Sequence, residues 1–218
     1  MVSVLSGGAR SNDPEKYHKD ALNLQKQFFD TLLDDPDDLN TRSIFYTAQS
    51  YFDCGRMEDS LKWYRLYTKM TGGWEEEYFE SHMRIARCMM ELGWDLNKII
   101  NQMTIAIDMF PDRAEPLFHL GRYCNNLREF DLGYKYLSEA NKKSLGEVQK
   151  KYILFVNSYT YGNFVKDDLS VSCYWTGRYQ EGYKYLIEII DSEDLSGHRE
   201  RLQENKRHFL NMMGSVAD

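Results

Sequence analysis

The chain has 218 residues and a formal net charge of −7 at pH 7. This acidic balance excludes the basic footprint that nucleic acids require and the polybasic patch that binds anionic membranes. No apolar run approaches the ~20 residues of a membrane-spanning helix, and the start MVSVLSGGAR lacks the pattern of a secretory signal. Because the four cysteines lie far apart, the sequence favours buried reduced thiols over a disulfide framework, and we expect a cytoplasmic protein.

The N-terminal part is predicted to hold a leader and one helix. Residues 1–12 are rich in Ser and Gly and are expected to be a flexible leader or linker remnant. Asp13 followed by Pro14 is a favourable N-cap and first-turn pair, so a helix is predicted over 13–35. Its register is that of the second helix of a pair whose first helix is absent, which predicts that something upstream covers it. The predicted inner side carries Leu22, Leu24, Phe28 and Leu32.

The acidic run DDPDD at 34–38 follows this helix. Asp35 and Asp37 match in form the D-x-D metal motif of glycosyltransferases, but here they lie between two helices with a proline between them. Carboxylates before a helix N-terminus stabilise its dipole, so a capping role is favoured over a metal site. The histidines and cysteines lack metal-binding spacings, and no nucleophile elbow, phosphate loop or dinucleotide fingerprint occurs. The sequence therefore predicts no catalytic residue, no cofactor and no metal site.

Four stretches after residue 40 repeat one pattern. A small residue recurs at spacings of 38, 35 and 49 positions, near the range of paired-helix solenoids. These small residues are Ala48, Ala86, Gly121 and Ser170, each followed three positions later by Tyr51, Met89, Cys124 or Cys173. Turns come seven positions after the small residues, at Gly55, Gly93, Arg128 and Gly177. The pattern predicts helix pairs at about 41–54 with 57–70, 75–92 with 95–110, 114–127 with 129–142, and 164–176 with 179–191.

Each feature of the pattern has a physical reason. The small residue lets the two helices of a pair approach closely, and the residue one turn later fills the gap between them. Glycine takes most easily the positive φ that ends a helix, so Arg128 departs from the pattern. A pair of this size cannot bury its apolar stripe alone, so neighbouring pairs must stack.

The C-terminal part adds three predictions. The connection 144–163 is expected to be ordered, as a short helix or an extended segment, because its apolar run Ile153 to Val156 would otherwise be exposed. Asp167 and Asp168 are interpreted as the solvated first turn of a helix. A charged helix at 196–213 is expected to cap the last pair with a polar outer face.

These residues resemble the tetratricopeptide-repeat (TPR) family over about 40–195. The positions that match its small, aromatic, turn and terminating residues are Ala48, Tyr51, Gly55, Tyr64, Ala86, Gly93, Ala106 and Pro111, with Gly182 and Leu186 in the fourth repeat. The resemblance implies an all-α fold, a right-handed superhelix of antiparallel helix pairs with a C-terminal capping helix. It implies one domain over 13–218, with repeats at about 40–73, 74–111, 114–143 and 163–192, and a role as a scaffold for protein–protein interaction.

A narrower resemblance concerns several short strings in the same order. The strings GGARSNDPEKY (7–17), FYTAQSY, AEPLFHLGRY and SCYWTGRYQEG look like the helical tail that follows a nucleotide-sugar glycosyltransferase domain in certain multidomain proteins. This resemblance implies that the chain is the tail of such an enzyme, or accessory to it. It also implies that the glycosyltransferase domain docks at residues 13–33.

The candidate binding surface is the concave side of the predicted array, which the first helix of each pair lines. The residues directly after the small positions are Gln49, Arg87, Arg122 and Val171, and equivalent positions in adjacent repeats stack on the order of 10 Å apart. The same face is expected to carry Phe52, Met83, Met90, Phe118, Asn125, Asn126, Tyr174 and Trp175. Two arginines among amides and aromatics suit a carboxylate, a phosphate or an extended peptide.

Several readings of this surface stay open. The arginines could instead form an internal polar ladder, paired with Asp53, Glu91 or Glu115. If the surface binds a ligand, a protein or peptide partner is the first hypothesis. An acceptor glycan stacked on Tyr174 and Trp175 is the second, and an enzyme of unrecognised type is a weaker third.

Overall fold

The computed structural model describes residues 13–34 and 40–215, and the regular structure within these ranges is helical. The predicted leader and the pair Asp35 and Asp37 lie outside the described residues. The chain falls into two compact units, Met1–Met109 and Phe110–Asp218. Each unit is described by itself below.

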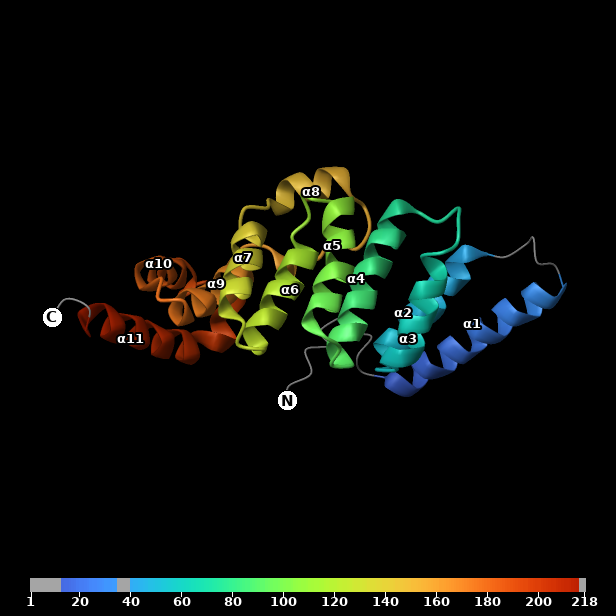
Figure 1. Ribbon diagram of the computed structural model, residues 1–218, viewed down its shortest axis with the longest axis horizontal. Coiled ribbons are helices and arrows are strands. Elements are labelled where there is room, and N and C mark those ends of the chain that lie inside the picture. The colour runs from blue at the N-terminus through green and yellow to red at the C-terminus, as the bar shows by residue number, and fades with distance from the viewer. Residues whose placement is uncertain (1–12, 35–39, 216–218) are drawn as a thin grey trace. The chain divides into compact units, whose positions relative to one another are not determined.

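The first unit contains five helices in its described part (Figure 1). They are α1 (Pro14–Asp34), α2 (Thr41–Asp53), α3 (Met57–Tyr67), α4 (Glu75–Glu91) and α5 (Leu96–Met109). Helix α2 packs against α3, and α4 packs against α5, while α1 covers α2 and α3 contacts α4. The pairs therefore form hairpins that stack on one another, and their helices begin and end within three residues of the predicted bounds.

The small and turn residues of the repeat have the predicted roles in this unit. Ala48 and Ala86 are fully buried, and the hydroxyl of Ser60 on α3 donates to the Ala48 carbonyl, 3.0 Å away. Gly55 and Gly93 take φ values of 80° and 67°, which residues other than glycine rarely adopt. The two alanines therefore let the paired helices approach closely, and the two glycines let the chain turn abruptly between them.

Helix α1 differs from its predicted packing. Ala21 and Phe28 are its buried residues, whereas Leu22 is 47% exposed and Leu32 is 36% exposed. The prediction that Leu22 and Leu32 lie on the inner side is therefore wrong. Helix α1 is rotated about its axis so that Phe28 faces α3. There the ring of Phe28 lies edge-on to Trp63, with 5.3 Å between the ring centroids.

The second unit contains α6 (Glu115–Asn126), α7 (Phe130–Ala140), α8 (Leu145–Lys151), α9 (Asn163–Trp175), α10 (Tyr179–Ile189) and α11 (Arg199–Ser215) in its described part. Two short 3-10 turns, η3 (Ser158–Thr160) and η4 (Glu193–His198), precede α9 and α11. Helix α6 pairs with α7 and α9 with α10, α7 contacts α9, and α11 covers α10. Leu202 and Phe209 of α11 join the core that Leu186, Ile189 and Leu195 form, so α11 packs on the last pair.

Two glycines permit these close contacts. A Cβ atom at Gly121 would lie 2.6 Å from Leu137 Cγ on α7, and one at Gly182 would lie 2.7 Å from Cys173 Cβ on α9. The buried Gly182 and Leu186 match the small-then-large pattern of the fourth repeat.

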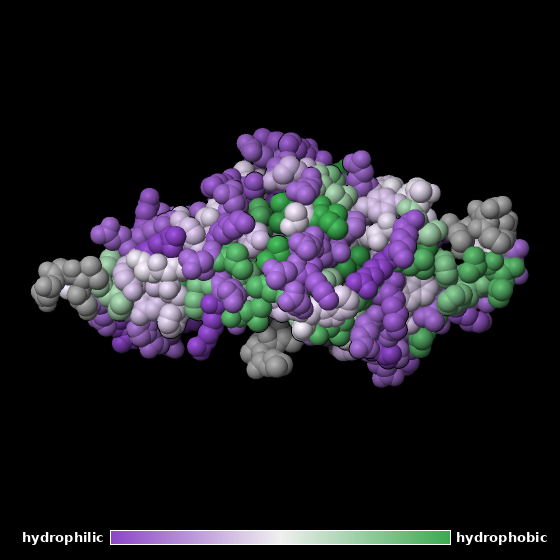
Figure 2. Space-filling model, viewed as in Figure 1, coloured by the Kyte–Doolittle hydropathy of each residue, from purple (hydrophilic) through white to green (hydrophobic). Residues whose placement is uncertain are grey.

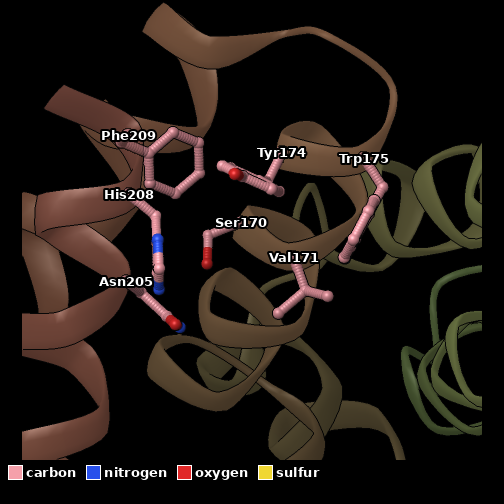
Figure 3. Close-up of a pocket in the computed structure, with 7 residues that line it drawn as sticks. All are labelled: Ser170, Val171, Tyr174, Trp175, Asn205, His208 and Phe209. Carbon is pink, nitrogen blue, oxygen red and sulfur yellow. The ribbon is translucent and has the colours of Figure 1, made fainter. Parts of the chain in front are cut away.

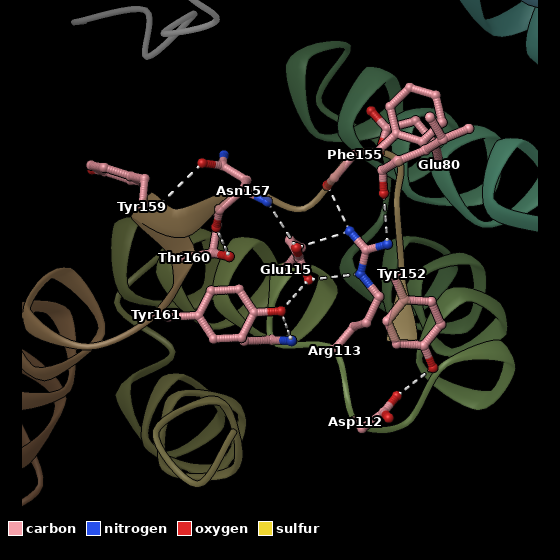
Figure 4. A network of polar contacts seen from close by, with 12 residues as sticks. Glu80, Asp112, Arg113, Glu115, Tyr152, Phe155, Asn157, Tyr159, Thr160 and Tyr161 are labelled. Carbon is pink, nitrogen blue, oxygen red and sulfur yellow. Dashed lines mark hydrogen bonds and ion pairs between the residues drawn. The ribbon is translucent and has the colours of Figure 1, made fainter. Parts of the chain in front are cut away.

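A buried ion pair holds the long connection between α7 and α9 (Figure 4). The side chains of Arg113 and Glu115 are fully buried, with Arg113 Nη2 2.9 Å from Glu115 Oε1. Arg113 also donates to the carbonyls of Leu154 and Phe155, at 3.1 and 2.6 Å. The connection is therefore ordered, as predicted, but Ile153 stays 87% exposed because the polar contacts fix the backbone and leave that side chain outside.

Candidate functional site

Two arginines of α4 share one aromatic ring in the first unit. The guanidinium carbons of Arg84 and Arg87 lie 4.3 and 5.0 Å from the ring centroid of Phe52. Phe52 belongs to α2, and its side chain is only 2% exposed. Arg84 is ion-paired with the buried Glu80, one turn before it on α4. Gln49 and Met90, predicted for the same face, are half-buried, and Met83 is buried.

Of these two arginines, Arg87 is the one without an ion-pair partner among the described residues. Burial and the neighbouring Arg84 lower the pKa of Arg87 to about 10. Among the described residues no carboxylate lies within ion-pair distance of its guanidinium, so the ladder that would pair Arg87 with Asp53 or Glu91 is not formed. The sequence prediction missed Arg84, although its spacing of three from Arg87 places both on one helix face.

Arg122 in the second unit has two polar partners. Its Nη1 donates to the Tyr159 hydroxyl at 2.6 Å, and its Nε lies 3.6 Å from Asp168 Oδ2 on α9. Arg122 is therefore paired with a carboxylate of the protein itself, as the polar-ladder alternative predicted. Its partner is Asp168, however, and the predicted partner Glu115 is wrong. Glu115 belongs to Arg113, because residue 115 begins α6 and faces the buried connection.

Asp167 and Asp168 lie in the second turn of α9, and their interpretation as a solvated first turn is wrong. Asp167 is 9% exposed and accepts two hydrogen bonds from Arg201 of α11, at 3.0 and 2.6 Å. Burial raises the pKa of Asp168 to about 6, against the opposing effect of Arg122. The two carboxylates and their arginines therefore join α6, α9 and α11.

The predicted amides and rings of α6 have separate environments. Asn125 donates to the Asp168 carbonyl at 2.9 Å and accepts from Ser172 at 2.7 Å, so it links α6 to α9. Asn126 is exposed, and Phe118 is fully buried beneath Arg122. These contacts make Asn125 and Phe118 parts of the framework and leave Asn126 on the surface.

Tyr174 and Trp175 line a pocket between α9 and α11 (Figure 3). The pocket has a volume of about 360 Å³. Figure 3 shows Ser170 of α9 near Asn205 and His208 of α11, and Val171 on the side of the pocket nearer to Trp175. Phe209 lies edge-on to Tyr174, 5.4 Å between ring centroids.

Trp175 is the exposed part of the pocket. It is 62% exposed, and its ring stacks on Phe130 at an interplanar angle of 12° and a centroid distance of 5.3 Å. The stacking holds a large flat apolar surface at the mouth of the pocket. The sequence predicted Tyr174, Trp175 and Val171 for one face, but missed the α11 side, because only the packing of α11 brings Asn205 and His208 opposite them.

Other kinds of site were sought in the described ranges. Residues 13–34 and 40–215 contain no group of three or more His, Cys, Asp or Glu side chains placed to hold a metal ion. No helix in those ranges is long and apolar enough to cross a membrane.

Comparison with known proteins identifies the fold. No protein-family model and no curated protein matches the chain. BtubC (BKLC) from P. vanneervenii matches with a TM-score of 0.62 and 13% identity, over 95% of this chain and 85% of that one. A tetratricopeptide repeat protein from Parabacteroides merdae gives 0.59 at 16% identity, over 96% and 76%. The protein MamA gives 0.57 at 12%, over 88% and 93%.

At these identities the likeness establishes the fold and nothing further. The chain has the all-α fold of tetratricopeptide-repeat proteins, as its repeat predicted. None of these three structures is described as a glycosyltransferase tail.

Proposed function

We propose that the chain is a non-catalytic interaction module that binds a segment of a protein partner. The observation that carries this proposal is the pocket between α9 and α11. Tyr174, Trp175 and Phe209 give the pocket aromatic walls, while Ser170, Asn205 and His208 supply a few polar groups. Pockets of this composition accept one bulky apolar side chain and orient the neighbouring peptide groups by hydrogen bonds.

Selection from a random dodecapeptide library displayed on phage tests this proposal with the whole chain as bait. We expect the selected peptides to share a large apolar residue. Changing Trp175 to Ala should weaken binding of the selected peptide tenfold or more, because this ring supplies the exposed wall of the pocket. Helicity should stay unchanged.

Trp74→Ala is the matched control, since Trp74 is also exposed (56%) but lies in the other unit. It should leave binding of the peptide unaltered. Failure to select any peptide, or equal affinity of the wild type and the Trp175→Ala variant, would contradict the proposal.

An acceptor glycan is the second candidate ligand of the same pocket. The supporting observation is the ring of Trp175, since exposed flat aromatic surfaces also stack on the apolar faces of sugars. The double change Tyr174→Ala and Trp175→Ala should then abolish binding on a glycan array while helicity is kept. An array with no bound glycan would remove this candidate.

A finer proposal is that the partner is a nucleotide-sugar glycosyltransferase domain that docks on α1. Two observations support it: the short strings that resemble the tail of such enzymes, and the apolar outer face of α1. Leu22 and Phe29 are each 47% exposed and Leu33 is 83% exposed. Figure 2 shows hydrophobic surface over the C-terminal part of α1.

Hydrogen exchange tests this docking. A cytosolic glycosyltransferase domain freed from its own helical tail should slow amide exchange over residues 14–34 when it is added in excess. The Phe29→Glu variant should lose that protection, since a charge on the apolar face opposes burial. Unchanged exchange in the wild type would count against docking on α1.

A further inference from the structure

The charge balance around Phe52 is uneven. Arg84 has a carboxylate partner in Glu80, whereas Arg87 is half-buried on the same ring with no carboxylate within ion-pair distance in the described ranges. A guanidinium removed from water without an ionic partner is costly, and natural proteins normally pair such a group. Arg87 therefore differs from Arg84 in having no ion-pair partner among the described residues.

The position of the half-buried Arg87 guanidinium is set by the ring of Phe52. Phe52 is fixed in the core between α2 and α4, and the cation–π contact holds the Arg87 guanidinium over the ring without using its N–H groups. A guanidinium presents its donors in a planar fork that matches an oxyanion in a bidentate manner. Arg84, at 4.3 Å from the same ring, adds a second positive charge beside it.

We propose that Phe52, Arg84 and Arg87 form an oxyanion-binding site that takes a carboxylate or phosphate group of the partner segment. Arg87 binds the oxyanion directly, Phe52 positions Arg87, and Arg84 adds attraction while it stays paired with Glu80. The source of the oxyanion rests on the proposed function, in which the partner is a protein segment. The site itself does not depend on the pocket between α9 and α11.

Titration of the arginine side chains by nuclear magnetic resonance tests this site. The Nε–H signals of Arg84 and Arg87 are assigned with the Arg84→Lys and Arg87→Lys variants. The probes are blocked tri-glutamate, blocked tri-glutamine, tri-glutamine with a free C-terminus and inorganic phosphate, all at constant ionic strength. We expect saturable movement of the Arg87 signal with at least one anionic probe and none with blocked tri-glutamine.

The anionic probes separate the sources of the oxyanion. A response to tri-glutamate assigns an acidic side chain, a response to the free C-terminus assigns a terminal carboxylate, and a response to phosphate assigns a phosphorylated segment. Arg87→Gln should weaken the bound probe at least tenfold. Arg42→Gln is the matched control, because Arg42 also stacks on rings of the same unit, at 5.7 Å from Tyr46, and should leave binding unchanged.

These titrations test the oxyanion-binding site independently of the pocket between α9 and α11. No saturable movement of the Arg87 signal with any anion, or equal binding by the Arg87→Gln variant, overturns the inference. Failure of the proposed pocket would instead show in the Trp175→Ala variant, which leaves the first unit untouched.

Discussion

At the scale of single residues, Arg128 holds a backbone conformation that glycine holds at the three equivalent turns. Its φ is 63°, and those of Gly55, Gly93 and Gly177 are 80°, 67° and 75°. The left-handed conformation costs a residue with a Cβ atom roughly 1–2 kcal/mol. The tertiary packing of α6 on α7 therefore imposes the turn on a side chain that disfavours it.

Replacing Arg128 by Gly should raise the free energy of unfolding. We expect a gain of about 0.5–1 kcal/mol, because relief of the left-handed strain exceeds the entropy that glycine loses on folding. Urea denaturation measures this change. Gly177→Ala is the converse variant and should lose about 1 kcal/mol; a less stable Arg128→Gly protein would show that the side chain has another role.

At the scale of elements, charged side chains link helices that are separate in the chain. Asp168 of α9 lies between Arg122 of α6 and its own neighbour Asp167, which Arg201 of α11 binds. Burial raises the pKa of Asp168 to about 6, whereas an unfolded chain has a value of about 4. The folded protein therefore binds this proton more readily than the unfolded chain does.

Stability should depend on pH through this group. Between about pH 4 and pH 6 the contribution of Asp168 to the free energy of unfolding falls as the pH rises, because the folded state keeps a proton that the unfolded state has lost. The wild type should thus lose about 2 kcal/mol relative to the Asp168→Asn variant across that window. Parallel denaturation curves of both proteins measure the difference, and a wild type that keeps or gains stability relative to the Asp168→Asn variant as the pH rises would refute the assignment.

The buried pair of Arg113 and Glu115 is the second tie between elements (Figure 4). Arg113→Leu would leave the carboxylate of Glu115 in the core without its guanidinium. We expect a loss of about 3–5 kcal/mol in the free energy of unfolding. Amide exchange over 152–161 should also accelerate, since Arg113 binds the carbonyls of Leu154 and Phe155.

The double variant Arg113→Leu with Glu115→Leu separates charge burial from packing. It should recover much of the lost stability, because no unpaired charge then remains in the core. A single variant that loses less than 1 kcal/mol would mean that the pair does not hold the connection.

At the scale of the whole molecule, the four cysteines report on the cores of both units. All four are free. Cys88, Cys124 and Cys173 are fully buried, and burial raises their pKa values to about 11, 11 and 12. Cys54 is half-buried at the end of α2.

Thiol labelling with a disulfide reagent at pH 8 should therefore proceed in two stages. We expect Cys54 to react first in the folded protein and the other three to react only as the chain unfolds, because thiolates are the reactive form and buried thiols are protected. A Cys54→Ser variant should show no early reaction. Early labelling of three or four thiols would contradict the burial of these residues.

The repeat explains why most of the fold could be predicted. Ala48, Ala86, Gly121 and Ser170 are all fully or almost fully buried, where helices meet. Both Tyr174 and Trp175, which the sequence predicted for one surface, line the pocket on α9. Arg84 was missed even though its spacing from Arg87 offered the signal.

The remainder depends on contacts between residues far apart in the chain. The ion pair of Asp167 with Arg201 depends on how elements pack and carries no local pattern. The same is true of the bonds from Arg113 to the carbonyls of Leu154 and Phe155, and of the α11 wall of the pocket. The rotation of α1 that exposes Leu22 was mispredicted for the same reason, because an apolar stripe does not say which of its edges meets the neighbour.

The sequence by itself determined the helices, their pairing and the fold class, because helical periodicity and the small and turn residues act over a few positions. Only the tertiary structure decided which charges are neutralised and which remain available. Within residues 13–34 and 40–215, Arg122 has an ion-pair partner and Arg87 does not. Ion pairs depend on distances of a few ångströms between separate helices, which the spacing of residues along the chain does not set.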